Sequence, residues 1–304
     1  MVKETDKHLL SRAEARVSFL YIEKAKIQQT EYGVEVVQGS QHSEIPITTI
    51  NCLFLGSGVS ITHKAICNIA QAGCTICFVG MDMNTFYAYG EPCTRKSKNL
   101  LIQIKMHENK QMHLDVVHRM YSIRYPDKKL KTKSVEELRG IEGIAVKNCY
   151  VANAEKFKIN WTGRSYKPNE FDKQDIVNMY ITALNHVLYA VVTSVIVSLG
   201  FSPAIGFIHT GHMNSFTFDI ADLYKEKYTI PLAFELATNE VYDRHKMLLK
   251  FRELIVNEKF MKQLVNDIFT IFNTEEDFTS IETELKLWGD KNFGIFGKNY
   301  SEDT

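Results

Sequence analysis

HVLYAVVTSVIVSLG, residues 186–200, is the longest apolar segment of the chain. It is shorter than the ~20 residues that a membrane-spanning helix needs, and it contains Thr193, Ser194 and Ser198. We therefore interpret it as part of a buried helix that runs from about residue 174 to residue 199. A helix that is apolar on all sides has to be enclosed by other elements. The segment thus predicts a helical domain built around one central helix, and no membrane association.

Helical patterns lie on both sides of this segment. Residues 100–125 carry apolar positions at helical spacing, Leu101 among them, and Pro126 closes the pattern. In residues 134–157, Ser134 and Glu137 have the spacing of a capping box. After the central helix, residues 242–256 are typical of a further helix. We expect these segments to form the larger, all-helical domain.

The first ninety residues indicate a different kind of domain. Short β-branched and aromatic runs, separated by polar or glycine-containing turns, predict strands in RVSFLYI, KIQQT, GVEVVQ, EIPIT, INCLFLG, TICFVG and TFYAYG. One helix interrupts them at residues 61–73, with Ile66, Ile69 and Ala70 on one face. The predicted fold class is α+β. A small N-terminal β-rich domain, 1–90, precedes a larger all-α catalytic domain, 91–280, and a tail, 281–304.

Composition and cysteine usage narrow the function classes. With 45% hydrophobic and 24% charged residues in 304, the chain is an ordinary globular protein. The segment MVKETDKHLLSRAEAR is polar throughout, so we do not expect secretion. Cys74 and Cys77 form a CxxC inside the apolar run GCTICFVG, and no second pair completes a zinc site. We interpret them as free core thiols of a cytoplasmic protein.

The net charge is formally zero, but the charges are unevenly distributed. Residues 94–133 contain 11 basic and 3 acidic residues, whereas residues 275–304 contain 3 basic and 8 acidic ones. A basic middle section suits a polyanionic partner such as DNA. A solvated, lysine-rich helix face explains the same composition.

Glu142 is out of place in the helix expected over residues 134–157. Its neighbours at helical spacing are mostly apolar, and a lone charge among them costs several kcal/mol unless it is paired or bound to a metal. Gly140 and Gly143 thin the helix beside the carboxylate, so that a backbone or a ligand can approach. The alternative is a salt bridge to Arg139 or to a distant arginine.

AIGFIHTGHMNSFTFDIADLYK, residues 204–225, supplies further candidate ligands. His209 stands where an apolar run meets glycine, and Asp219 and Asp222, three residues apart in an expected helix, share a face. Carboxylates with an imidazole suit Mn²⁺ and tolerate Mg²⁺. Such an ion assists in-line attack on a phosphodiester by water or a 3′-hydroxyl. A core histidine, and an N-cap role for Asp219, would explain the same residues without a metal.

Long segments of the chain resemble a known family. RGIEGIAVKNCY, residues 139–150, and GFSPAIGFIHTGHMNSFTFDIADLYK, residues 200–225, with PLAFELA soon after, resemble the CRISPR-associated spacer-acquisition integrase, the first universal adaptation protein, in its subtype I-E branch. The resemblance covers nearly the whole chain. It implies an N-terminal β domain that dimerises and braces DNA, and a helical catalytic domain. It also implies homodimers, two of which flank a dimer of a small partner, the second universal adaptation protein.

The same resemblance implies an activity. Members insert foreign DNA fragments into a CRISPR array by attack of a 3′-hydroxyl on repeat-boundary phosphodiesters, and the same site is expected to cut DNA. Glu142, His209 and Asp222 carry over as ligands of Mg²⁺ or Mn²⁺, and Asp219 as an acidic companion, so that these four form the catalytic set. The alternatives are a stand-alone repair nuclease for branched DNA and a non-catalytic DNA-binding scaffold.

Further residues are expected to contact double-stranded DNA, both the foreign fragment and the CRISPR repeat. Tyr166 and Phe171 offer base stacking and Arg164 a phosphate or base contact, although the two aromatic residues would serve equally to pack their loop. The other candidates are Arg139, Arg244, Lys246, Lys250 and His212, the last at a position where this branch often has lysine. The tail residues Trp288, Phe293, Ile295 and Phe296 are expected to dock on the small partner or to fold back on their own subunit.

Overall fold

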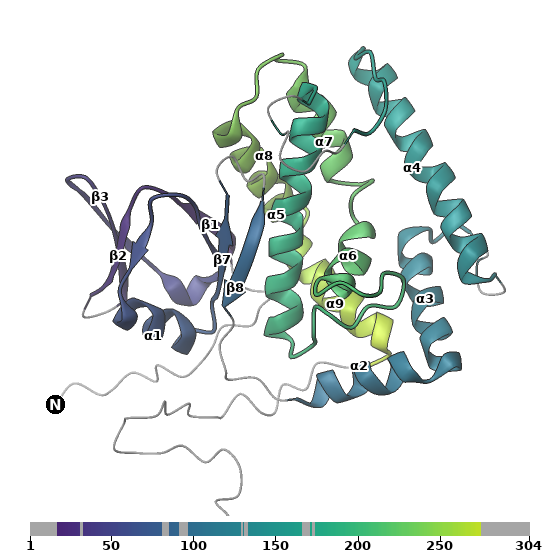
Figure 1. Ribbon diagram of the computed structural model, residues 1–304, viewed down its shortest axis with the longest axis horizontal. Helices are drawn as coiled ribbons and strands as arrows, with labels where there is room; N and C mark the ends of the chain where they lie inside the picture. The colour runs from purple at the N-terminus through teal and green to yellow at the C-terminus, as the bar shows by residue number, and fades with distance from the viewer. Residues whose placement is uncertain are drawn as a thin grey trace, which may run out of the picture.

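The computed structural model of the protein describes residues 17–30, 33–80, 85–90, 97–128, 130, 133–165, 171 and 174–274. Strands occupy its N-terminal part and helices its C-terminal part (Figure 1). The α+β fold class is therefore confirmed. The predicted domain boundaries and the roles given to the domains stay predictions, and the tail, 281–304, lies outside the described residues.

The strands form two sheets. The first has the order β1-β5-β7-β8, in which β8 alone runs antiparallel to its neighbour. The second has the order β4-β3-β2-β6. The elements of this part are β1 (Val17–Ile22), β2 (Lys26–Gln29), β3 (Val34–Gln38), β4 (Gln41–Ile45), η2 (Ile47–Thr49), β5 (Ile50–Leu55), β6 (Ser60–Ile61), α1 (His63–Gln71), β7 (Thr75–Val79) and β8 (Phe86–Gly90).

Strand β5 is covered on both faces, which explains its continuous apolar sequence INCLFL. Cys52 and Phe54 belong to the core that the first sheet shares with the helices. Leu53 and Leu55 belong to a second core, formed with residues of β2, β3 and α1. The strand therefore joins the two halves of the molecule through alternate side chains.

The helices surround α5 (Ile176–Ser198), which lies in the centre of the molecule (Figure 1). By length and composition α5 could cross a membrane, but 83% of its most apolar window is buried inside the protein. The buried helix predicted over 174–199 is thus confirmed. The other helices are α2 (Lys98–Glu108), α3 (Lys110–Arg124), α4 (Val135–Phe157), α6 (Ser215–Asp222), α7 (Thr229–Ala237), α8 (Arg244–Asn257) and α9 (Phe260–Phe272).

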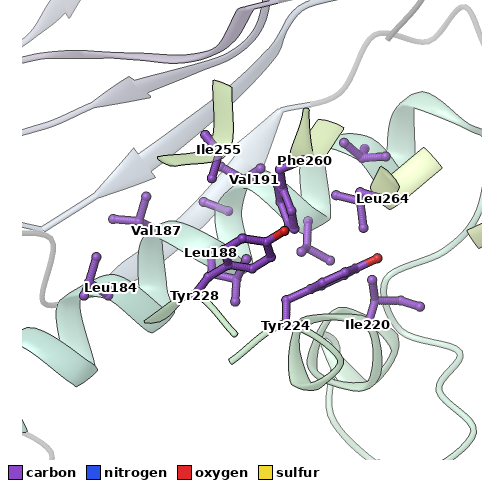
Figure 2. Close-up of a cluster of buried hydrophobic side chains, with 14 of the residues drawn as sticks. Leu184, Val187, Leu188, Val191, Ile220, Tyr224, Tyr228, Ile255, Phe260 and Leu264 are labelled. Atoms are coloured by element: carbon purple, nitrogen blue, oxygen red, sulfur yellow. The ribbon is translucent and has the colours of Figure 1, made fainter. Parts of the chain in front are cut away.

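Side chains from several helices interlock on α5. Figure 2 shows one such cluster, in which α5 meets residues from α6, α8 and α9 and from the segment between α6 and α7. Its labelled members are Leu184, Val187, Leu188, Val191, Ile220, Tyr224, Tyr228, Ile255, Phe260 and Leu264. This cluster fixes α6, and with it the two aspartates of the predicted site, against the centre of the fold.

The helical pattern of residues 100–125 corresponds to two helices, α2 and α3. Asn109 has an extended backbone between α2 and α3, and its side-chain oxygen accepts hydrogen bonds from the amides of Gln111 and Met112. Asparagine at such an N-cap favours a new helix start over continuation. Leu101, one of the apolar positions of the helical pattern, is exposed.

Helix α1 packs on a different face from the one predicted. Ala65 and Ile69 are buried, whereas Ile66 is exposed. Beside it, Cys74 and Cys77 are both buried, which confirms that the CxxC belongs to the core.

Candidate active site

One pocket collects side chains from α3, α4, α6 and the loop that precedes α6. Glu142 comes from α4, His209 from the loop, and Asp219 and Asp222 from α6. The fold therefore brings the four predicted catalytic residues together, although their catalytic and ligand roles remain predictions. The full lining is Met120, Tyr121, Arg124, Glu142, Ile208, His209, Asp219, Asp222 and Leu223.

Asp219 organises the loop that carries His209. Its side chain is 1% exposed. Oδ2 accepts hydrogen bonds from the amides of Phe207 (2.5 Å) and Ile208 (3.1 Å). Oδ1 accepts from the amide of His209 and lies 2.8 Å from the Nδ1 of its ring. Both oxygens are thus engaged by the loop, so Asp219 acts on the pocket through His209.

The N-cap alternative for Asp219 is wrong. Helix α6 begins at Ser215, with Asn214 in the N-cap position, so Asp219 lies in the second half of the helix. Asp219 and Asp222 do share the face that lines the pocket, as their spacing predicted.

The bond to Asp219 determines which nitrogen of His209 is available. The carboxylate accepts, so Nδ1 carries the proton and the neutral ring presents its Nε2 lone pair. Nε2 lies 3.9 Å from Oδ2 of Asp222. The hydrogen bond that His209 donates to Asp219 raises the pKa of His209 above its ordinary 6.5, burial opposes the rise, and the charges of Asp219 and Asp222 add to it. The side chain is 44% exposed, so the ring is accessible from solvent.

Glu142 is held by two residues of α3. The hydroxyl of Tyr121 donates to Oε2 at 2.6 Å, and Arg124 donates to Oε1. Arg124 also pairs with Glu226 at 2.7 Å, and its side chain is only 5% exposed. Burial lowers the pKa of Arg124, but Glu142, with Tyr125 and Glu226, more than offsets this, so the pKa is raised and the guanidinium stays charged.

The distant arginine considered for Glu142 is therefore Arg124, and Arg139 has another partner. Arg139 donates to the backbone oxygen of Ile208, next to His209. This contact ties α4 to the loop, so the helix that carries Glu142 is attached directly to the segment that carries the imidazole. The sequence did not reveal Arg124 or Tyr121, because both come from a separate helix.

Asp222 faces a lysine that sequence reasoning also missed. The Nζ of Lys225 lies 2.5 Å from Oδ1 of Asp222 and donates to the hydroxyl of Tyr189 at 2.7 Å. Burial lowers the pKa of Lys225, but Asp222 and Tyr189 raise it by more, so the amine stays protonated. The i, i+3 spacing of Asp222 and Lys225 was the signal that could have identified the pair.

The donor atoms of the pocket fit a hard divalent cation. Two ligands with bonds of ~2.1 Å to one ion lie at most ~4.2 Å apart, and His209 Nε2 and Asp222 Oδ2 satisfy this limit at 3.9 Å. Asp219 behind Nδ1 is the carboxylate–histidine arrangement that orients metal ligands. Among the described residues, no three His, Cys, Asp or Glu side chains are close enough to hold an ion as they stand. Glu142, the third candidate, has both oxygens bound by Tyr121 and Arg124.

Two of the loop residues expected to read DNA have contacts within the protein, and their contact with DNA stays a prediction. Arg164 donates to Asn178 (2.7 Å) and Thr182 (3.0 Å) of α5. The ring of Phe171 lies edge-on to Tyr242, with centroids 5.5 Å apart, which is the packing alternative considered for it. Tyr166 lies outside the described residues.

The remaining DNA candidates differ in how far they are engaged. On α8, Arg244 pairs with Glu23 at 2.6 Å and Lys250 pairs with Glu235. Asp243, the N-cap of α8, accepts a hydrogen bond from the backbone amide of Lys246. His212 is exposed, and its Nδ1 accepts from the amide of Asn214 at 3.0 Å. Contact of these residues with DNA stays a prediction.

Comparison with known proteins places this architecture in one family. The model of the CRISPR associated protein Cas1 family matches residues 121–268, which contain all four predicted catalytic residues. The CRISPR-associated endonuclease Cas1 2 of Chlorobaculum tepidum is 35% identical over 91% of this chain and 94% of its own length. The CRISPR-associated endonuclease Cas1 of a Clostridium species is 32% identical, over 97% and 99%. Among solved structures, a TtCas1–DNA complex superposes with a TM-score of 0.65 at 35% identity, covering 84% of this chain and 95% of that one.

Proposed function

The chain belongs to the CRISPR-associated Cas1 family, and from this premise we propose that it is a metal-dependent DNA endonuclease and integrase of CRISPR adaptation. The relatives carry the name of endonucleases, which supports phosphodiester chemistry. The observation that carries the proposal is the pocket itself, in which His209 presents Nε2 beside Asp222 while Glu142 lines the same cavity.

The charge of the pocket supports a divalent cation. Glu142, Asp219, Asp222 and Glu226 contribute four carboxylates, and the two cations paired with them are Arg124 and Lys225. With neutral His209, the cluster is left with an excess of two negative charges. A bare phosphodiester would be repelled from such a pocket, whereas a divalent cation cancels the excess and attracts it.

Double-stranded DNA is the proposed substrate. The TtCas1 relative has been solved with DNA. The candidate ligands are partly exposed, Glu142 at 20% and Asp222 at 18% of the side chain, so a phosphate group can reach them without local unfolding. Beside Glu142, a Cβ added at Gly140 or Gly143 would meet no atom within 4 Å. This open helix face leaves room for a DNA backbone.

We assign the following roles in the reaction. An ion held by Glu142, His209 and Asp222 would stabilise the negative charge that develops on the reacting phosphate. Asp219 keeps the proton of His209 on Nδ1, and thus Nε2 free. In joining, the 3′-hydroxyl of the fragment loses its proton to solvent as its oxygen bonds to phosphorus. The bond from phosphorus to the repeat's own 3′-oxygen breaks, and that oxygen takes up a proton and leaves as a 3′-hydroxyl. One phosphodiester replaces another, so joining needs no external energy source; water as nucleophile gives cutting instead.

The finer parts of the proposal rest on the resemblance of residues 139–150 and 200–225 to the subtype I-E branch. We propose that the chain belongs to that branch, acts in the cytoplasm, and forms homodimers. Two such dimers would flank a dimer of the small second adaptation protein.

The test is a joining assay with the purified chain, with and without the small partner. A short duplex with 3′-hydroxyl ends, a plasmid with a CRISPR array, and Mn²⁺ or Mg²⁺ are supplied. We expect joining that requires both the partner and the metal. Glu142→Ala should abolish it, while Glu155→Ala, which removes an exposed acid near the end of the same helix, should not.

The other possible outcomes support the alternative functions or contradict the proposed metal site. Cutting of branched DNA without joining, with or without the partner, would indicate the repair nuclease. DNA binding without any covalent change would indicate the scaffold. Joining that persists in Glu142→Ala would contradict the proposed metal site while leaving the family assignment intact.

A further inference from the structure

The inward face of α2 carries apolar residues, Ile102 and Met106, that pack against the core, and beside them a row of polar side chains. Its one fully buried side chain is Gln103. Asn99, Gln103 and His107 are four residues apart and therefore lie in a row along one side of the helix. Helices that pack for stability alone bury an apolar stripe. The row must be explained by what it contacts.

The first two members of the row bind the backbone that follows α5. Asn99 donates to the oxygen of Leu199 at 2.7 Å. The Nε2 of Gln103 donates to the oxygens of Ser202 (3.0 Å) and Ile205 (2.9 Å), and its Oε1 accepts from the amide of Ser202 at 2.7 Å. Gln103 thus uses all of its polar groups on the segment that leads to the pocket.

Two histidines continue the series toward His209. The Nδ1 of His107 lies 2.9 Å from the oxygen of Gly206. The Nε2 of His113 lies 2.7 Å from the oxygen of Phe207, and its Nδ1 lies 3.2 Å from the oxygen of His107. A carbonyl oxygen only accepts and a neutral imidazole donates from one nitrogen, so we assign the donors to Nδ1 of His107 and, at its shorter contact, to Nε2 of His113. We name Asn99, Gln103, His107 and His113 the loop ladder.

The segment held by the loop ladder has little room to move. Both backbone polar groups of Phe207 are hydrogen-bonded, since its oxygen accepts from His113 and its amide donates to Asp219. A Cβ at Gly206 would overlap the backbone oxygen of His209. The path of the backbone just before the imidazole is therefore fixed by hydrogen bonds from α2, α3 and α6.

We propose that the loop ladder is a positioning device for His209. By holding the oxygens of residues 199–207 it sets the backbone from which the imidazole projects, and Asp219 then sets the ring. The proposal rests on the proposed function, in which Nε2 of His209 binds the divalent cation. If the loop ladder only satisfied buried carbonyls, small changes in the position of its donor atoms would not affect cation binding by His209.

Substitution by asparagine or glutamine separates these possibilities, because the two side chains place the same amide group at two different distances from the backbone. The amide nitrogen of asparagine reaches about as far as Nδ1 of histidine, and that of glutamine about as far as Nε2. His107 donates through Nδ1 and His113 through Nε2. We therefore expect a crossover, in which His107→Asn and His113→Gln retain the function and His107→Gln and His113→Asn lose it.

Two measurements on the full-length protein alone detect the crossover. Mn²⁺ affinity, measured by electron paramagnetic resonance, should stay within about twofold of wild type in the two retaining variants and fall about tenfold or more in the two losing ones, the size typical of lost support behind a ligand. Amide hydrogen exchange at residues 207–209 should speed up in the losing variants only, with α5 unchanged as the internal reference.

The proposal is overturned if Asn and Gln behave alike at both positions. If the losing variants do not fold, Asn99→Ala provides the test, because it removes one hydrogen bond at the half-buried end of the row. Unchanged amide exchange at residues 207–209 together with unchanged Mn²⁺ affinity in this variant would then contradict the proposal. Wild-type protein that binds no Mn²⁺ would contradict the proposed metal dependence instead, and the exchange pattern would still test the loop ladder.

Discussion

At the scale of single residues, Asp219 and Asp222 differ in role although they are three residues apart on one helix. Asp219 is buried, and its oxygens are engaged by three backbone amides and one imidazole nitrogen. Asp222 is partly exposed and faces the Nε2 of His209. Sequence spacing gave both residues the same face and could not separate them. The difference arises because the loop before α6 folds back over the first carboxylate.

The raised pKa of His209 predicts a pH-dependent stability. The hydrogen bond to Asp219 raises the folded-state pKa of His209 above the unfolded value of 6.5. The interaction of the protonated ring therefore contributes stability that is fully present below pH 6.5 and is lost as pH rises through the folded pKa. Urea unfolding of wild type and His209→Gln at several pH values should show the wild-type advantage shrinking as pH rises.

The control for this prediction is Asn214→Ala, a substitution in the same segment that removes no titratable group, since Asn214 makes no side-chain cap hydrogen bond to α6. Its difference from wild type should stay flat over the same range. A His209→Gln difference that is equally flat, or that grows with pH, would mean that the bond to Asp219 does not favour the charged ring.

Residue chemistry predicted part of the pocket and missed the rest for a definite reason. Glu142 was recognisable because a carboxylate on an apolar helix face needs a partner. Arg124 and Tyr121, which supply that partner, were not, because no local pattern links α3 to α4. Contacts between separate helices depend on packing angles, which periodicity does not encode.

At the scale of elements, α4 has a well-capped N-terminus and a turn of low helix propensity around Glu142. Ser134 and Glu137 form the predicted capping box at its N-terminus. Gly140 and Gly143 weaken the turn that carries Glu142, yet the space around them is open. The crowded position is elsewhere, at Gly206, where a side chain has no room.

Alanine substitution should therefore have opposite effects at these glycines. Gly140→Ala should raise the free energy of unfolding by about 1 kcal/mol, because alanine is the better helix former and nothing obstructs its Cβ. Gly206→Ala should lower it by about 1–3 kcal/mol through overlap with His209. Urea denaturation measures both, and equal effects would contradict the packing described here.

The same Gly140→Ala variant tests why the open face exists. If a DNA backbone approaches α4 there, the variant should be more stable and yet bind the duplex more weakly than wild type in a filter-binding assay. A variant that is more stable and binds equally well would show that the glycine does not serve close approach.

At the scale of the whole molecule, the strand-rich and helical parts are joined through polar as well as apolar contacts. Asn51 of β5 donates to Ser194 of α5 at 2.7 Å, and both residues are fully buried. Ser194→Ala should destabilise the protein by about 1–3 kcal/mol, because it leaves the Asn51 amide without its partner. Ser198→Ala is the matched control, since its hydroxyl bonds only within α5.

A double substitution separates the hydrogen bond from the packing. Asn51→Leu combined with Ser194→Ala removes both polar groups, so most of the stability lost in Ser194→Ala should return. Equal losses in the single and double variants, by chemical denaturation, would assign the effect to packing in α5 alone.

The order of strands and helices was predictable from periodicity. Residues 186–200 are apolar on all sides and had to be covered by other elements, and the first ninety residues carried strand patterns. The way the parts meet was not. INCLFL reads as one buried strand, but only the fold shows that its alternate residues enter two different cores. The break at Asn109 was likewise hidden, because an apolar pattern can continue across two helices.

The central claim is that one divalent cation binds Glu142, His209 and Asp222. Crystals grown with Mn²⁺ test it directly through the anomalous signal of the metal. We predict one peak in this pocket, with ligand bonds of about 2.1–2.3 Å to His209 Nε2 and to both carboxylates, and with Arg124 withdrawn from Glu142. The account would be contradicted by a pocket without a peak at saturating Mn²⁺, or by a peak there while Glu142 remains bound to Arg124.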